Sequence, residues 1–320
     1  MILLFGSADD PHIQAVEPHL SKSGADTLIL DHTARTSITI DIDRAAFYYG
    51  TRKIAFRDVD VAWYRSKFDY PRFGIGDRFR SDYVRGVAWH DAIAGLATIL
   101  ADKVVNSYSA IQRSSRKLDQ LVVAKGLGLK IPPTLVTTSS QELSQWATPG
   151  DDLIVKAIQD ATIPDPSAPL GCVSAMTTRV DRDLLNREPL ERSRSPTLFQ
   201  FEIKKAFELR VSIHGRSLFA SRINSSERPY MEVDWRYGSS ICKYEPFSID
   251  ADVERLLRKY LVHYDLFSGQ FDLIVDRDGT YWFLECNPQG FWIFLDQEWD
   301  YQISQTCAEE ILSDRKVRFN

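Results

Sequence analysis

The segment 270–288 places the strongest local constraint on the fold, because two runs of alternating apolar and polar residues flank Asp278-Gly279. This dipeptide between such runs is typical of a two-residue turn in a β-hairpin. A two-residue turn fixes which residues of the two strands face each other. The predicted pairs are Val275 with Trp282, Leu273 with Leu284, and Asp272 with Glu285. The sequence therefore predicts an antiparallel hairpin in which two carboxylates lie side by side.

Carboxylates that face each other across a hairpin repel and would destabilise it. Asn287 lies two residues after Glu285 and therefore points to the same face. A hard cation would neutralise these acids, and Mg²⁺ binds one or two carboxylates together with substrate phosphates, so the pattern predicts a nucleotide site. Two alternatives stay open: both acids face water, or a three-residue turn sends them to opposite faces.

The composition restricts the class of protein. Of 320 residues, 44% are hydrophobic and 26% are charged, which is typical of a globular chain and excludes a disordered or fibrous one. At roughly 150 residues per domain, this length predicts two or three lobes with room for a cleft between them. The formal net charge of −5 argues against a nucleic-acid partner, which usually requires a basic excess.

Neither membrane insertion nor export is expected. The longest uncharged apolar stretch, 92–101, has ten residues, whereas a membrane-spanning helix needs roughly 20. The first seven residues lack a basic segment and a cleavage site, so they predict a strand and not a signal peptide. We therefore expect a cytoplasmic protein without a membrane partner.

Cysteine and histidine supply no recognisable site. The cysteines are too widely spaced for a zinc motif, and in the cytoplasm we expect them to be reduced. They are Cys172, Cys242, Cys286 and Cys307. The histidines form no ligand-spaced pair, and His12 and His19 are expected on a surface face of one helix.

Residues 1–105 are predicted to form an N-terminal α/β lobe, which opens with a β-α-β unit. Its expected strands are 2–5, 27–30, 38–42, 47–49 and 59–63, and its expected helices are 11–22 and 80–100. Residues 106–196 are predicted to form a central lobe. Its expected helices are 116–126 and one that begins at Ser139 or Ser140, its strands are 134–137 and 153–156, and a loop follows from Asp160 to Gly171.

Residues 197–320 are rich in alternating patterns and predict a third, C-terminal lobe with an antiparallel sheet. The expected strands are 198–203, 207–213 and 218–223, followed by a helix over 250–263, the hairpin, and a last helix over 301–312. The predicted fold class is thus mixed α/β and α+β.

Four polar side chains occupy positions suited to phosphate or ribose. Lys117 begins a helix and Lys156 ends an apolar strand, where a lysine can contact phosphates as a point charge; a solvated lysine is the alternative. Alternation puts Glu208 and Arg210 on one strand face. This pair can contact ribose and phosphate or form a structural ion pair, and the residues alone leave both open.

Taken in order, these segments resemble the ATP-grasp superfamily, and the resemblance covers the whole chain. Within that superfamily they are most similar to the microviridin or graspetide synthetases, which crosslink ribosomally made peptides. The segments that carry the resemblance are Asp58-Val-Asp-Val-Ala-Trp-Tyr-Arg65, Phe199-Gln200, Lys205, Glu208-Leu-Arg210, Val233-Asp-Trp-Arg236 and Glu285-Cys-Asn-Pro-Gln-Gly290. The implied architecture is an ATP-grasp fold, with an N-terminal α/β lobe, a central lobe and a C-terminal antiparallel-sheet lobe, and ATP gripped between the last two.

The resemblance also implies a role for individual residues. Lys117 and Lys156 would hold ATP phosphates, Gln200 and the backbone near Ile203 would meet adenine, and Glu208 would bind ribose. Arg210 would stabilise phosphoryl oxygens, with Arg222 as a second phosphate or acyl-phosphate contact. Asp272, Glu285 and Asn287 would hold Mg²⁺, and Asp234 and Arg236 would lie near the peptide substrate.

The chain departs from the family pattern at three places. It has Phe201-Glu202 where a glutamate more often precedes an aromatic residue, and Phe291 where a polar residue is frequent. The loop 160–171, at the place of the loop that covers the phosphates, contains prolines and a single glycine. No predicted ligand is removed by these differences.

The function implied by the resemblance is an ATP- and Mg²⁺-dependent ligase. It would activate Asp or Glu side chains of a precursor peptide as acyl phosphates and form ω-ester or ω-amide crosslinks, which requires no protein nucleophile. The implied partners are a precursor peptide with a leader segment and a second copy of the chain. Two alternatives are a ligase that adds a free amino acid to a carboxylate and a nucleotide-binding regulatory protein without turnover.

Overall fold

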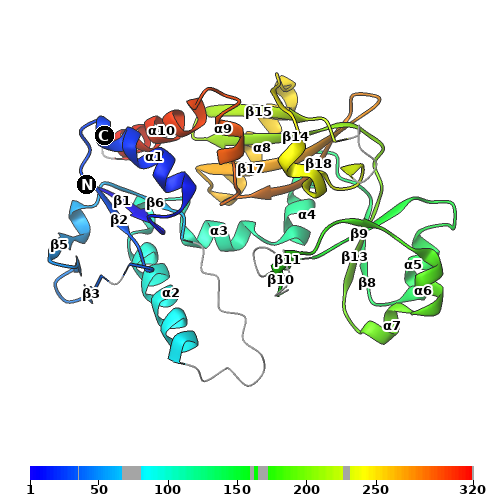
Figure 1. Cartoon of the computed structure of the whole chain (residues 1–320), viewed down its shortest axis with the longest axis horizontal. Helices are drawn as coiled ribbons and strands as arrows, with labels where there is room; N and C mark the ends of the chain where they lie inside the picture. Colours follow the sequence, from blue (N-terminus) through cyan, green and yellow to red (C-terminus); the bar gives the residue numbers. More distant parts are fainter. Residues whose placement is uncertain (35, 67–80, 159–161, 165–171, 226–230, 319–320) are drawn as a thin grey trace.

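The structure is a computed structural model that describes residues 1–34, 36–66, 81–158, 162–164, 172–225 and 231–318. Most of the predicted loop 160–171 and the side chain of Cys172 lie outside the described part. Figure 1 shows an N-terminal region, a central region at the opposite end, and a C-terminal sheet that lies between and above them. No described helix is long and apolar enough to cross a membrane.

The N-terminal region contains a parallel sheet with strand order β2-β1-β6-β7. Its strands are β1 (Ile2–Phe5), β2 (Thr27–Leu30), β6 (Val61–Tyr64) and β7 (Val104–Val105). Helix α1 (Pro11–Lys22) joins β1 to β2, and the Asp10 side chain caps it by accepting from the His12 backbone N–H. The β-α-β opening is thus confirmed. The lobe also contains helix α2 (Ser81–Ile99) and the 3-10 helices η1 (Phe56–Asp58) and η3 (Ala101–Lys103).

A separate antiparallel sheet is inserted between β2 and β6, with the order β3-β4-β5. Its strands are β3 (Ile38–Asp41), β4 (Ala46–Tyr49) and β5 (Arg52–Ala55). Alternation predicted the first two strands, but the short β5 was missed.

The central region is an antiparallel sheet with the order β12-β9-β13-β8. Its strands are β8 (Thr134–Thr137), β9 (Leu153–Lys156), β12 (Thr178–Arg179) and β13 (Thr197–Phe201), and β10 (Thr162–Pro164) pairs with β11 (Cys172–Ser174). Its helices are α5 (Ser140–Trp146), α6 (Arg182–Arg187) and α7 (Leu190–Ser193), and α3 (Tyr108–Ser114) and α4 (Lys117–Leu127) lead into it. Because β13 pairs with β8 and β9, this sheet extends past residue 196.

The C-terminal sheet is antiparallel, with the order β16-β15-β14-β17-β18. Its strands are β14 (Lys205–His214), β15 (Ser217–Ile223), β16 (Tyr244–Pro246), β17 (Ser268–Asp276) and β18 (Tyr281–Asn287). The remaining helices are η5 (Trp235–Ile241), α8 (Ala251–Tyr264), α9 (Ile293–Asp296) and α10 (Gln302–Arg318). One sheet face packs apolar side chains against α4 and α8. Helix α10 lies beside α1 and packs into the apolar core of the N-terminal lobe (Figure 1).

The β17–β18 hairpin corrects the predicted register. Three residues, 277–279, form the turn, with Gly279 at a φ of 79°, and Asp276 donates its backbone N–H to the Thr280 carbonyl. The pairs next to the turn are therefore Val275 with Tyr281, Ile274 with Trp282, and Leu273 with Phe283. A bulge between Asp272 and Leu273 then restores the predicted pair of Asp272 with Glu285. The predicted partners of Val275 and Leu273 were wrong, whereas the pair of acids is confirmed.

Candidate active site

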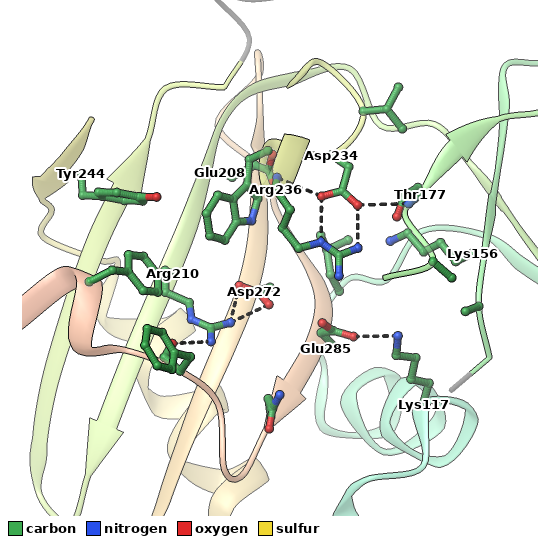
Figure 2. Close-up of a pocket in the computed structure, with 18 residues that line it drawn as sticks. Lys117, Lys156, Thr177, Glu208, Arg210, Asp234, Arg236, Tyr244, Asp272 and Glu285 are labelled. Atoms are coloured by element: carbon green, nitrogen blue, oxygen red, sulfur yellow. Dashed lines mark hydrogen bonds and ion pairs between the residues drawn. The ribbon is translucent and has the colours of Figure 1, made fainter. Parts of the chain in front are cut away.

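A cavity of about 620 Å³ is lined by residues of both the central and the C-terminal sheet regions. Figure 2 shows its charged side chains, with Lys117 and Lys156 toward one end, Tyr244 at the other, and Arg210 and Asp272 between them. The predicted site residues that line it are Lys117, Lys156, Glu208, Arg210, Asp234, Arg236, Asp272, Glu285 and Asn287. The fold thus gathers into one cavity predicted side chains from widely separated parts of the sequence, from Lys117 to Asn287.

The two carboxylates of the hairpin are neutralised by side chains of the chain itself. Arg210 Nη1 donates to both carboxylate oxygens of Asp272, at 2.8 and 2.7 Å, and Lys117 Nζ lies 3.3 Å from Glu285 Oε2. Burial raises the pKa of Asp272, Arg210 lowers it, and Glu285 raises it further. Asp272 therefore shares its site with a second acid and needs a positive partner to remain ionised.

A second cluster surrounds Lys156 at the end of β9. Burial lowers the pKa of Lys156, while Glu285 and Glu208 raise it. Lys156 forms no ion pair with the residues that the structure describes. A half-buried ammonium in this position gains from an anionic ligand, since desolvation disfavours its charge.

Glu208 lies on the same face of β14 as Arg210 and is also buried. Its Oε1 accepts from the Lys205 ammonium, with which it forms an ion pair, and from the Ser225 hydroxyl at 2.9 Å. Burial raises the pKa of Glu208, and Lys205 opposes this shift. In this arrangement Glu208 forms a structural ion pair, and it still faces the cavity.

Asp234 and Arg236 form a third pair in the cavity wall, at the start of η5. Arg236 donates from Nε to Asp234 Oδ1 at 2.9 Å and from Nη2 to Oδ2 at 2.6 Å. Oδ2 also accepts from the Thr177 backbone N–H at 3.0 Å. Burial would raise the pKa of Asp234, but Arg236 and these hydrogen bonds hold it below its usual range. The pair thus links the C-terminal region to the connection between β11 and β12.

Three predicted residues do not line the cavity. Arg222 pairs with Leu209 on β14, which puts it on the face opposite Glu208 and Arg210. Its guanidinium lies 4.2 Å from the centre of the Phe207 ring and donates to Asn224 Oδ1 at 2.7 Å. The prediction that Arg222 contacts a phosphoryl group is therefore corrected: the turn at 214–217 sets a register that turns this side chain away from the cavity.

Gln200 and Ile203, predicted to lie at the adenine, are likewise not in the cavity wall. Gln200 is buried in β13, where its Nε2 donates to Thr134 Oγ1 at 2.9 Å. Its Oε1 has no hydrogen-bond partner among the described residues. In this structure Gln200 contributes to the central sheet, and Ile203 is half-buried in the segment between β13 and β14.

Aromatic side chains at the end of the cavity away from the lysines were not predicted. The rings belong to Trp235, Tyr244, Phe291 and Phe294. Phe294 lies at the centre of the group, with ring centroids 4.9 Å from Tyr244, 5.8 Å from Trp235 and 6.1 Å from Phe291. Because the rings come from loops and short elements that are distant in sequence, periodicity could not group them. The sequence motif around Trp235 and the unusual Phe291 were the available signals.

The donors on β17 and β18 fit a hard divalent cation. Asp272, Glu285 and Asn287 offer carboxylate and amide oxygens from adjacent strands, a donor set that suits Mg²⁺ together with phosphate oxygens. Asp272 and Glu285 would hold the ion, and Asn287 would add an amide oxygen. The neighbouring ammonium and guanidinium groups of Lys117, Lys156 and Arg210 suit a polyphosphate.

Comparison with solved structures identifies the fold. A RiPP-associated ATP-grasp ligase from Chryseobacterium gregarium, in complex with ADP and a leader and core peptide, matches with a TM-score of 0.82 at 24% identity, over 98% of this chain and 96% of its own. Macrocyclase MdnC from Microcystis aeruginosa MRC, bound with precursor peptide MdnA, matches with a TM-score of 0.81 at 23% identity, over 98% of this chain and 99% of its own.

A third structure, ATP-grasp ligase PsnB complexed with a phosphomimetic variant of a minimal precursor, Mg and ADP, matches with a TM-score of 0.78 at 19% identity, over 98% of both chains. No protein-family model and no curated protein matches the sequence. Because its backbone matches these structures over almost its whole length, the chain has the ATP-grasp fold.

Proposed function

We propose that the chain is an ATP-grasp ligase that activates Asp or Glu side chains of a precursor peptide as acyl phosphates and forms ω-ester or ω-amide crosslinks within it. One observation carries the proposal. A single cavity joins a cationic end, a pair of acids fitted to Mg²⁺ and an aromatic end. The cationic end suits the triphosphate, and the aromatic end leaves room for a peptide beside the reacting phosphate.

The reaction follows from these placements. A carboxylate oxygen of the peptide attacks the γ-phosphorus of ATP, the bond between this phosphorus and the bridging oxygen breaks, and ADP leaves with the electron pair. The amine or hydroxyl of a second side chain then attacks the acyl carbon. The bond between the acyl carbon and the phosphate oxygen breaks, and inorganic phosphate leaves with the electron pair. The attacking group loses its proton to solvent.

The side chains in the cavity have separable tasks. Lys117 and Lys156 bind phosphate oxygens, and Arg210 stabilises the charge on the transferred group. Arg210 and Lys117 now pair with Asp272 and Glu285, and they can turn to phosphate oxygens once these carboxylates hold another cation. Mg²⁺, when bound, neutralises charge on the phosphates. Arg236, held by Asp234, offers a positive group for the incoming peptide carboxylate.

The proposal extends to the assembly and its setting. We assign residues 1–105 to a pre-ATP-grasp domain, 106–196 together with strand β13 to the central ATP-grasp lobe, and the rest of 197–320 to the lobe that holds the metal site. The leader segment of the peptide serves as a binding handle, and two copies of the chain form a dimer. The reaction takes place in the cytoplasm, where ATP is available.

Mass spectrometry tests this function. The purified protein is mixed with MgATP and the short peptide encoded beside its gene, and the peptide should lose the mass of one water for each bond formed while ADP appears. A gain equal to an amino-acid residue, when free amino acids are supplied, would instead identify a ligase for free amino acids. ATP binding with no ADP formed under any of these conditions would identify a nucleotide-binding regulatory protein.

A further inference from the structure

The loop 288–292 lies directly after β18. It is held by side chains and backbone of the N-terminal lobe and by Asn106, the first residue after that lobe. Its contacts are Asn106 Nδ2 to the Pro288 carbonyl at 3.0 Å, Gln289 Nε2 to the Tyr64 carbonyl at 3.1 Å, Arg65 Nη1 to the Gly290 carbonyl at 3.4 Å, and the Trp292 N–H to His12 Nε2 at 3.2 Å. Four of the five loop residues thus hydrogen-bond to this part of the chain. The N-terminal lobe therefore sets the path of the loop.

The same loop touches Arg210. The Phe291 carbonyl accepts from Arg210 Nη2 at 2.9 Å. A Cβ on Gly290 would lie only 2.9 Å from this nitrogen and 2.6 Å from the Gln270 side chain. The guanidinium therefore rests between the backbone of the loop on one side and Asp272 on the other, and a shift of the loop moves it.

His12 and Arg65 are buried, with exposed fractions of 1% and 5%, so the expectation of a surface His12 was wrong. The Trp292 N–H donates to His12 Nε2, and the other ring nitrogen, Nδ1, lies 2.9 Å from Asp10 Oδ1 and 2.8 Å from Arg65 Nη2. Arg65 Nη2 lies 3.7 Å from Asp10 Oδ2. Burial would raise the pKa of Asp10, but the hydrogen bond from His12 and the charge of Arg65 lower it to about 2.

Burying a guanidinium and its partners costs free energy that a packed apolar group would not. Hydrophobic packing of α1 and β6 would hold the lobe together without them. These polar groups supply directional contacts to two backbone atoms of the loop instead, which fixes its position more closely than apolar packing can.

We propose that His12 and Arg65 are positioning residues that act through the backbone of 290–292 to hold Arg210 at the transferred phosphoryl group. This inference rests on the proposed function for the role of Arg210. The position of the Arg210 side chain itself can be measured without any turnover, which separates the two.

The variant that tests it is His12→Phe, which removes the acceptor for the Trp292 N–H; His12→Gln keeps an acceptor near the same place. In crystals with MgADP, His12→Phe should displace the loop and break the hydrogen bond between Arg210 and the Phe291 carbonyl, while His12→Gln retains both. With the precursor peptide and MgATP, kcat should fall at least tenfold for His12→Phe with KM for ATP unchanged. His12→Gln should recover most of it.

A cycle with Arg210→Met distinguishes positioning from a loss of fold stability. In the Arg210→Met background, His12→Phe should cause little further loss of kcat, since the residue it positions is gone. Val16→Ala, a buried change on the same helix, is the matched control and should lower stability while kcat stays unchanged. The inference is overturned if Arg210 keeps its position in His12→Phe crystals, or if the losses of kcat in the two variants simply multiply.

Discussion

Arg210 and Asp272 face each other directly across strands β14 and β17, and one guanidinium nitrogen donates to both carboxylate oxygens. Arg210, which we propose stabilises the transferred phosphoryl group, thus forms an ion pair with Asp272, which we propose as a metal ligand. The pair keeps the half-buried Asp272 carboxylate neutralised before ligands bind, since burying an unpaired charge is costly.

Replacing the acid tests this arrangement. Asp272→Asn should lower kcat by about 100-fold, the scale seen when one stabilising group is removed from an active site, and should raise the Mg²⁺ concentration needed for half-maximal turnover. Turnover measured over a Mg²⁺ titration checks both effects. Glu245→Gln, an exposed acid of β16 outside the cavity, is the control. If the Asp272→Asn enzyme keeps the wild-type Mg²⁺ dependence, Asp272 is not a metal ligand.

The close approach of Gly290 to Arg210 leads to a second prediction. Gly290→Ala places a methyl group against Nη2 and against Gln270, so we expect kcat to fall about tenfold, equivalent to about 1.4 kcal/mol. Gly95→Ala in α2 is the matched control, because no atom lies within 4 Å of its added Cβ. It should leave kcat unchanged and stabilise the fold by about 0.5–1 kcal/mol. Equal kcat values for the two variants would contradict the prediction.

The pair of acids could be predicted from sequence, but the path to it could not. The turn has three residues and one extra residue, Leu284, compensates for it as a bulge. A bulge changes the local backbone conformation, but it barely alters the alternation of apolar and polar residues in the sequence, so this alternation does not reveal it. Arg222 shows the same limit, because the face of a strand depends on the register of its neighbour.

Tertiary contacts explain the other differences. His12 lies on a helix face that looks polar in sequence, yet residues of the loop 288–292 cover it. The aromatic end of the cavity is assembled from segments on both sides of α8, and no local pattern joins them. Lysine positions and the carboxylate pair were predictable because each sits at the end or on one face of a regular element.

The aromatic end should bind the peptide and not the nucleotide. Phe291 is 45% exposed and stacks on Phe294 with an interplanar angle of 6°. Phe291→Ala should therefore raise KM for the precursor peptide about tenfold, or about 1.4 kcal/mol, while KM for ATP stays the same. Tyr48→Ala on β4, outside the cavity, is the control. A rise of KM for ATP with KM for the peptide unchanged would place the nucleotide base at this end.

His214 predicts how stability depends on pH. The residue is buried, and neither ring nitrogen has a hydrogen-bond partner among the described residues. Burial, followed by the charges of Arg65 and His12, lowers the pKa of His214 from 6.5 to about 3. Between these two values the unfolded chain takes up a proton that the folded chain does not. The contribution of His214 to stability is therefore present above pH 6.5 and is lost as the pH falls toward about 3.

His214→Phe removes this proton uptake, so its free energy of unfolding should decline less steeply than that of the wild type over the same pH range. Urea unfolding at several pH values within the range measures the slope. His263→Gln, an exposed histidine on α8, is the control and should follow the wild type. Because His214 packs beside Trp292, at 5.3 Å between ring centroids, its protonation would also put charge next to the loop that holds Arg210. If the slope for His214→Phe equals that of the wild type, His214 is not the group that makes the fold sensitive to acid.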